Sequence, residues 1–166
     1  NYVKKVVFPI EIIPLVALAA SAFNFVVSFV VLALFLVIFG AGITPTILLA
    51  PVVILPFLLF LAGVAWFVSA ISVYLKDVTY IAGFVATAMM FLSPVFYSLE
   101  AVPGNFYQVM MLNPLTYYIE AFRSCVIGGE VPATHFFLVT YGVGIVTSLL
   151  GYGFFQKVRR GFADVL

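Results

Sequence analysis

The sequence predicts an all-α integral membrane protein, with four transmembrane helices and a re-entrant pair of short helices on the outer side of the membrane. Of its 166 residues, 66% are hydrophobic and 8% are charged, and the mean hydropathy is +1.30. In an ordinary soluble domain about 25% of the residues are charged. No formally charged residue lies between Glu11 and Lys76, although one helical span needs only about 20 residues. We therefore expect a single transmembrane domain over residues 1–166, with two spans before Lys76.

The first two spans are predicted at residues 11–39 and 45–75, because Thr44-Pro45 is typical of the start of a helix. Stripes of small and polar side chains run along the predicted spans and allow helices to pack closely in lipid. A pore-facing position for Asn24 is the alternative to packing. The stripes consist of Ala17, Ser21, Asn24 and Ser28 in the first span, Ala62, Ala65, Ser69 and Ser72 in the second, and Gly144, Ser148 and Gly151 in the last.

The other two spans are predicted at residues 78–99 and 134–156, and Asp77 is placed to cap the first of them. Basic residues are retained preferentially on the cytoplasmic side of a membrane. With these spans, six of the seven basic residues lie on one side of the membrane and only Arg123 lies on the other. We therefore expect both ends of the chain, including the tail 157–166, to face the cytoplasm. The six residues are Lys4, Lys5, Lys76, Lys157, Arg159 and Arg160.

The segment 101–129, between the last two spans, is too polar to cross the membrane. Pro103 begins one short helix. Asn113 is a typical N-cap residue and Pro114 a typical first residue of a second short helix. Gly128-Gly129 ends this second helix. Two short helices that start and finish on the same side form a re-entrant hairpin, which membranes tolerate only against protein or a water-filled cavity.

Within this segment, Glu120 and Arg123 are three residues apart on one helical face and can form an ion pair. A shallow interfacial helix with an exposed ion pair is the alternative to the re-entrant hairpin. Aromatic side chains gather at the same level, either as an interfacial aromatic belt or as a path for a sugar, because tyrosine combines an apolar body with a polar tip. They are Phe96, Tyr97, Phe106, Tyr107, Tyr117 and Tyr118.

The sequence argues against catalysis by this chain. It contains no G-x-x-x-x-G-K-[ST] phosphate-binding loop, and His135 stands alone beside the last span. The single cysteine, Cys125, lacks the companions of a metal site and is expected to be a packed, inert thiol. The few basic residues are dispersed, so no nucleic-acid partner is expected.

The predicted cytoplasmic start of the chain combines Lys4-Lys5 with Glu11 at the threshold of the first span. The lysines could anchor lipid headgroups. An acid is favoured at a helix N-terminus by the helix dipole, and at the membrane boundary Glu11 is also available to a cytosolic partner. Lys76-Asp77 forms a tight connection on the same side.

Four stretches, in order and spacing, resemble the permease subunits of ABC transporters that export polysaccharides such as O-antigen, capsular polysaccharide or teichoic acid. They are KKVVFPIEIIP, KD, FLSPVFYSLEAVP and LNPLTYYIEAFR. The resemblance implies a bacterial inner-membrane homodimer with two ATP-binding subunits, which would hold ATP and magnesium. It also implies six spans per permease, of which this chain would supply the last four, with the N-terminal part missing. No cofactor is expected on this chain itself.

The resemblance also assigns roles to residues. Residues 1–10 and the first inner connection would couple the permease to the ATPase, and the hairpin would be a gate on the outer side. Lys76 stands where the family usually carries arginine, so a single point charge replaces the forked group that a bidentate contact would need. The coupling residues would be Lys4, Lys5, Phe8, Pro9, Glu11, Lys76 and Asp77; the gate residues Pro94, Pro103, Asn113, Pro114, Glu120 and Arg123; and the aromatic path Phe96, Tyr97, Tyr107, Tyr117 and Tyr118.

The expected function is thus ATP-driven export of a polysaccharide or a lipid-linked glycan. Two alternatives are an exporter of a drug, lipid or other small molecule, and a passive channel or scaffold without an ATPase.

Overall fold

The computed structural model describes residues 9–39 and 44–164, without the side chains of Glu100, Asn105, Ala163 and Asp164. The described chain is helical and contains no strand. Its short elements are the 3-10 helices η1 (Pro45–Leu49), η2 (Leu99–Ala101) and η4 (Arg159–Asp164) and the π-helical turn η3 (Ser124–Gly128). Its α-helices are α1 (Ile12–Ile38), α2 (Ala50–Ser72), α3 (Asp77–Phe91), α4 (Gly104–Met111), α5 (Pro114–Arg123) and α6 (Thr134–Val158).

Three helical segments are long and apolar enough to cross a membrane. They are Ile12–Ile38, Pro45–Ser72 and Thr134–Phe162, with 27, 28 and 29 residues. At a rise of about 1.5 Å per residue, each exceeds the hydrocarbon thickness of about 30 Å. Because their mean hydropathies lie between 1.5 and 2.8, the protein is an all-α membrane protein, as the composition predicted.

The helix α3 is shorter than the span predicted at 78–99. It has 15 residues and ends at Phe91. Proline has no N–H to donate and disfavours helical geometry in the residue before it, so Pro94 stops the helix. The Ser93 hydroxyl then donates to the Met89 carbonyl at 2.6 Å. The predicted cap is also wrong, because Lys76 occupies the N-cap position and no side chain makes a capping bond there.

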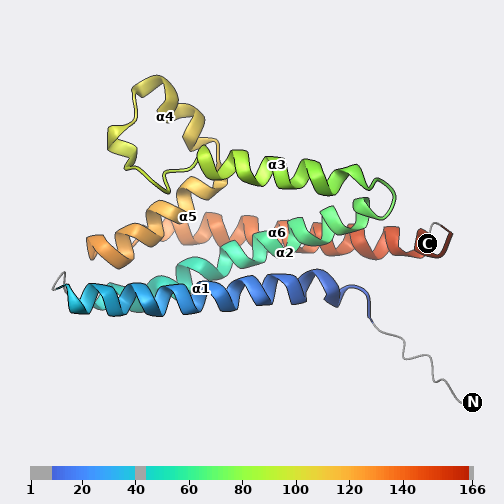
Figure 1. The fold of residues 1–166 in the computed structure, drawn as a ribbon, viewed down its shortest axis with the longest axis horizontal. Coiled ribbons are helices and arrows are strands. Elements are labelled where there is room, and N and C mark those ends of the chain that lie inside the picture. The colour runs from blue at the N-terminus through green and yellow to red at the C-terminus, as the bar shows by residue number, and fades with distance from the viewer. Residues whose placement is uncertain (1–8, 40–43, 165–166) are drawn as a thin grey trace, which may run out of the picture.

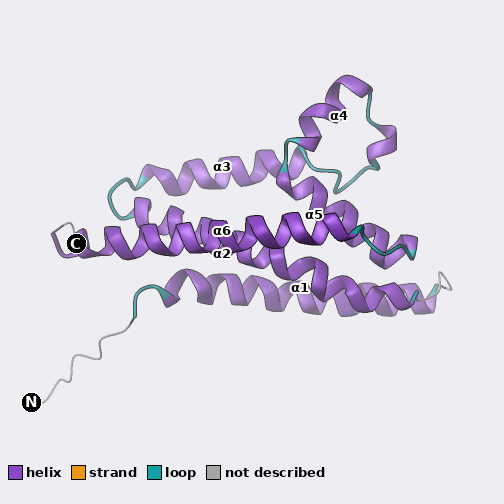
Figure 2. Ribbon diagram, turned by 180° about the vertical axis from the view of Figure 1, so that it is seen from behind, coloured by secondary structure: helices purple, strands orange, loops and turns teal. Residues whose placement is uncertain are grey.

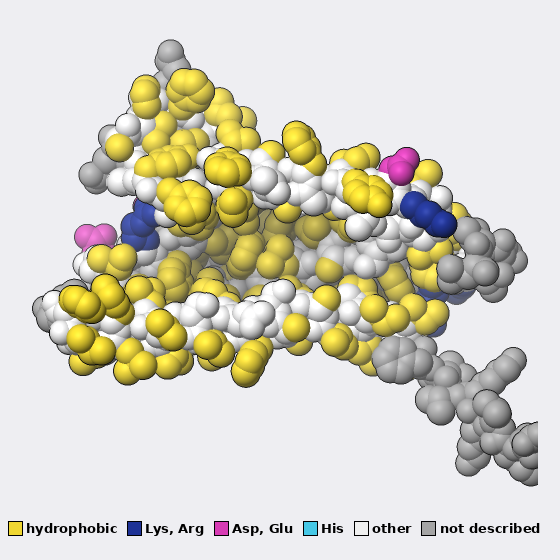
Figure 3. All heavy atoms as spheres, in the orientation of Figure 1, with side chains coloured by type: hydrophobic (Ala, Val, Ile, Leu, Met, Phe, Trp, Pro, Cys, Tyr) yellow, Lys and Arg dark blue, Asp and Glu magenta, His cyan; other side chains and the backbone are white. Residues whose placement is uncertain are grey.

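The helices α1, α2, α3 and α6 lie lengthwise beside one another, and α4 projects at one end (Figure 1; Figure 2). The start of α1, the turn between α2 and α3, and the end of α6 share the opposite end. Charged side chains on the face seen in Figure 3 are confined to the two ends, while hydrophobic side chains cover the length between them and a hollow separates α3 from α1. This distribution is the one a bilayer requires.

Glycines bring α2 and α6 into backbone contact. A Cβ built on Gly151 would overlap the backbone of Gly63, and one on Gly63 would overlap the backbone of Thr147. A Cβ on Gly144 would lie 2.6 Å from the Pro56 carbonyl oxygen. The small-residue stripe predicted in the last span therefore packs a helix, as expected of such stripes in lipid.

The stripe on α1 behaves differently. Ala17, Ser21, Asn24 and Ser28 are all exposed, and the Ser21 hydroxyl donates to the Ala17 carbonyl of its own helix at 3.1 Å. Within the described part of the chain, this stripe does not make the close helix packing that was expected of it.

Candidate functional site

The hairpin of α4 and α5 is joined at Leu112-Asn113, as predicted, and its tip is attached to the end of α3. The Asn113 carboxamide oxygen accepts from the Leu115 N–H at 3.0 Å and so caps α5. Its nitrogen donates to the Met89 carbonyl at 2.9 Å and to the Ser93 hydroxyl at 2.8 Å. Asn113 is 7% exposed and Ser93 is fully buried. One side chain therefore starts α5 and holds it against α3.

A second attachment lies at the other end of α5. Arg123 pairs with Glu120 at 2.5 Å, as the spacing predicted. Its second terminal nitrogen donates to the Pro94 carbonyl at 2.5 Å and reaches the Tyr97 carbonyl at 3.5 Å. A partly exposed ion pair contributes only about 0–1 kcal/mol. The geometric role of Arg123, which joins α5 to the loop after α3, is thus more informative than the ion pair.

The turn η3 forms a third attachment, between the hairpin and η1, the short helix that precedes α2. In a π-helical turn, carbonyl groups lose their regular helical partners, and the Cys125 carbonyl instead accepts from the Thr46 hydroxyl at 2.7 Å. Gly129 ends the turn with φ of 69°, a left-handed conformation that favours glycine. Cys125 is fully buried, which agrees with a packed thiol.

The structure does not bring the five predicted path residues to one surface. Tyr118 is 5% exposed and packs on Phe57, with ring centroids 4.9 Å apart. Tyr117 is half exposed and shares a cleft with Tyr118. Tyr97 lines a different cleft, beside α4, and its hydroxyl donates to the Phe91 carbonyl at 3.1 Å. The side chains of Phe96 and Tyr107 are exposed.

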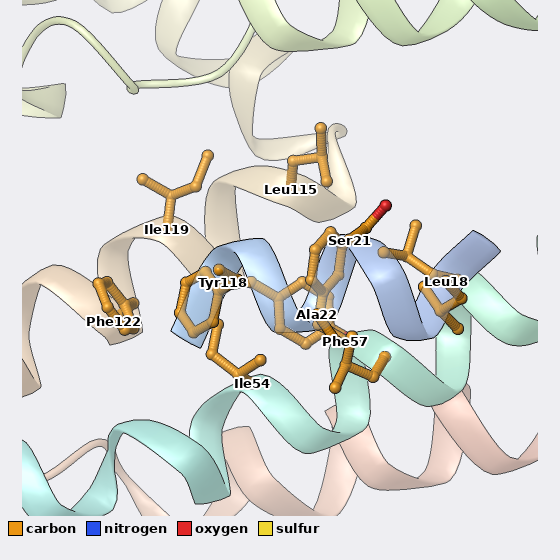
Figure 4. Close-up of a pocket in the computed structure, with 12 residues that line it drawn as sticks. Leu18, Ser21, Ala22, Ile54, Phe57, Leu115, Tyr118, Ile119 and Phe122 are labelled. Atoms are coloured by element: carbon orange, nitrogen blue, oxygen red, sulfur yellow. The ribbon is translucent and has the colours of Figure 1, made fainter. Parts of the chain in front are cut away.

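Two further clefts border α5. One has a volume of about 320 Å³ and lies between α1, α2 and α5 (Figure 4). Its walls are apolar except for Ser21 and Tyr118. The other has a volume of about 390 Å³ and lies between α5 and α6, with His135 and Tyr117 among its lining residues. Either side of α5 thus offers space for a molecule with a large apolar part.

At the opposite end of the molecule, Glu11 joins α1 to two other helices. Its carboxylate accepts from the Arg159 guanidinium at 2.8 Å, and its carbonyl accepts from the Trp66 indole N–H at 2.9 Å. Arg159 lies 148 residues from Glu11 in the sequence, so no local pattern revealed the pairing. A backbone hydrogen bond is the main cause that lowers the pKa of Glu11 from its ordinary value of 4.5. Desolvation opposes it, and Arg159 lowers the pKa further.

The other residues predicted to couple to an ATPase lie at the same end or outside the described residues. Lys76 and Asp77 are exposed in the turn between α2 and α3, and Pro9 is exposed just before α1. Lys4, Lys5 and Phe8 lie outside the described residues.

The lowered pKa of Glu11 yields a pH prediction. A carboxylate whose pKa is lower in the folded protein stabilises it above the ordinary pKa, and this contribution is lost as the pH falls through the folded value. We expect Glu11→Gln to lower the thermal unfolding midpoint by a few degrees at most at pH 7, since the pair is exposed. The difference from the wild type should shrink as the pH falls below the ordinary value of 4.5 and disappear below the lowered pKa of the folded protein.

Asp77→Asn is the matched control for this prediction, because Asp77 is an exposed carboxylate at the same end. A Glu11→Gln difference that persisted unchanged at acid pH would show that the ion pair is not its cause.

Comparisons with known proteins agree with the helical architecture. Residues 1–127 match the family model described as ABC-2 type transporter. The chain is 25% identical over 167 residues to an O-antigen export system permease protein RfbA of Klebsiella pneumoniae and 25% identical over 162 residues to an RfbA of Myxococcus xanthus. These alignments cover 99% and 96% of the chain but 63% and 62% of the relatives. The chain therefore spans less than two thirds of the length of either relative.

Proposed function

Because the chain belongs to the ABC-2 type transporter family, we propose that it forms part of the transmembrane channel through which a polysaccharide or a lipid-linked glycan leaves a bacterial cell across the inner membrane. The substrate class is proposed because the chain is similar, over nearly its whole length, to proteins named as O-antigen export permeases. Three helices long enough to cross the bilayer support the membrane role.

The energy for export would come from a partner, since the sequence contains no phosphate-binding loop. In this proposal two copies of the permease assemble with two ATP-binding subunits, which hold ATP and magnesium. The chain ends would face the cytoplasm, next to those subunits. A displacement of the segment before α1 would reach α2 and η4, the short helix that follows α6, because Glu11 is bonded to Trp66 and Arg159.

The hairpin would act as the outer gate of the channel. Asn113 attaches its tip to Met89 and Ser93, and Arg123 attaches the end of α5 to Pro94. A shift of α3 would therefore carry the hairpin with it. In this proposal Asn113 and Arg123 have the same role, because each joins the hairpin to the end of α3.

Export is tested with the full-length protein in cells that lack their own permease, with and without the ATP-binding subunit. We expect polysaccharide at the cell surface only when both are present. Tyr117→Ala should slow export about fivefold, the equivalent of about 1 kcal/mol for one lost aromatic contact. Tyr80→Ala is the control, because Tyr80 is an exposed tyrosine of α3 outside the hairpin.

Transport that continued without the ATP-binding subunit would favour a passive channel and contradict this function. Unchanged export by Tyr117→Ala would remove Tyr117 from the glycan path without affecting the assignment of the permease.

A further inference from the structure

The cleft between α5 and α6, called here the α5–α6 cleft, is built for an amphiphile. Its volume of about 390 Å³ falls within the range of about 300–1,000 Å³ typical of small-molecule sites. Its lining residues come from the hairpin and from the first turns of α6. They include Tyr117 and Tyr118 of α5 and His135, Val139, Thr140 and Val143 of α6.

The polarity of the cleft changes along its length. On α6, His135, Val139 and Val143 follow one another at intervals of four residues and form one stripe about 12 Å long, at a rise of about 1.5 Å per residue. His135 is exposed in the first turn of α6, at the end of the molecule where the hairpin also finishes. The Thr140 hydroxyl donates to the Phe136 carbonyl of its own helix at 2.7 Å, so the deeper wall is effectively apolar.

The polar end also continues into a neighbouring cleft. A second space of about 350 Å³ shares Tyr117, His135 and Phe136 with the α5–α6 cleft and extends toward Glu120. The two spaces therefore meet at Tyr117 and His135, so a ligand in the apolar part has room for a bulky polar group at the outer end.

Tyr118 supplies an unused hydrogen-bond donor. The side chain is 5% exposed, and its ring packs on Phe57 and Phe136. Its hydroxyl has no hydrogen-bond partner among the described residues. No fully enclosed side-chain polar atom of the described chain lacks a partner, so this hydroxyl is not fully enclosed. Tyr118 lines both the α5–α6 cleft and the cleft between α1, α2 and α5. A molecule in the α5–α6 cleft that carries an oxygen acceptor can therefore accept a hydrogen bond from Tyr118.

We propose that the α5–α6 cleft binds one glycerophospholipid from the outer leaflet of the membrane. An acyl chain lies along Val139 and Val143, an ester carbonyl accepts from the Tyr118 hydroxyl, and the phosphate group lies near His135 and Tyr117. The order of these groups along a phospholipid, from apolar tail to polar head, is the order of polarity along the cleft. The surrounding bilayer supplies the ligand, and the site does not depend on which molecule the protein exports.

The experiment measures phospholipid that stays with the full-length protein through extensive detergent washing, by lipid extraction and mass spectrometry. We expect one phospholipid per wild-type chain. Val139→Trp fills the cleft and should lower retention at least fivefold. Leu138→Trp is the matched control, because Leu138 is the adjacent residue, is 73% exposed and does not line the cleft. Equal retention by Val139→Trp and the wild type would overturn the proposal.

A second variant keeps the test valid if Val139→Trp does not fold. Tyr118→Phe retains the ring that packs on Phe57 and should lower retention about threefold to fivefold, as expected for one lost hydrogen bond. Tyr80→Phe, at an exposed tyrosine of α3, should retain lipid as the wild type does. Unchanged retention by Tyr118→Phe would contradict the contact with the ester carbonyl.

A photoreactive benzoylphenylalanine at Val143 then identifies the occupant in the washed protein. An adduct with the mass of a glycerophospholipid supports the proposal. An adduct with an isoprenoid-linked glycan, or with a protein segment of this or another chain, overturns it.

Discussion

Replacing Gly151 by alanine is expected to break the packing of α2 on α6 and to destabilise the folded protein by at least about 3 kcal/mol, at the upper end of the cost of overpacking. The added methyl group would overlap the carbonyl oxygen, carbonyl carbon and Cα of Gly63. These are backbone atoms of a buried residue of α2, so no flexible side chain is available to move aside. The two helices would have to separate.

Gly153→Ala is the control within the same helix. A Cβ on Gly153 meets no atom within 4 Å, and both substitutions bring the same gain of about 1 kcal/mol in helix propensity. Thermal unfolding in detergent should show a midpoint for Gly151→Ala lower by about 6–12 °C, at about 2–4 °C per kcal/mol for a chain of this length. Gly153→Ala should equal or exceed the wild type. Equal midpoints for the two variants would refute the contact between α2 and α6.

Asn113→Ala is expected to detach the hairpin from α3 and to cost about 2–4 kcal/mol. Loss of an N-cap costs about 0.5–2 kcal/mol, and each further hydrogen bond that is lost costs about 0.5–1.5 kcal/mol. Asn113 makes both kinds of bond, because it caps Leu115 and donates to Met89 and Ser93. We expect faster hydrogen exchange over residues 104–123, with the exchange of α2 and α6 nearly unchanged.

Asn113→Ser separates the two contributions. Serine caps a helix as well as asparagine does but lacks the carboxamide nitrogen that reaches Met89 and Ser93. Its unfolding midpoint should fall between those of the wild type and Asn113→Ala, with fast hydrogen exchange in the hairpin. A serine variant with wild-type exchange would show that the cap alone holds the hairpin.

Several features of the fold followed from local sequence because their causes are local. Pro114 fixes a backbone angle and lacks the N–H that a helix start leaves unpaired, and Asn113 carries the acceptor that a helix start needs. The hairpin could therefore be located from a few residues. Glu120 and Arg123 are neighbours on any helix, so their ion pair was also predictable.

The two ends of α3 differ from the ends that local sequence predicted. Asp77 is a residue type that caps helices, but the chain begins the helix one residue earlier and leaves Lys76 in the cap position. The apolar run continues beyond Phe91, so a prediction from hydropathy alone continued the helix to Leu99. Pro94 ended the helix instead, because proline disrupts backbone hydrogen bonding whatever the hydropathy of its neighbours.

By itself, the sequence determined that the protein is helical, that it lies in a membrane and that a hairpin precedes its last span, because composition, span length and capping depend on neighbouring residues. Only the tertiary structure decided which residues meet. Glu11 pairs with Arg159, Gly151 contacts Gly63, and Asn113 reaches Ser93. Each contact depends on how whole helices pack, and helix packing is set by the shapes of complete surfaces, which no short stretch of sequence contains.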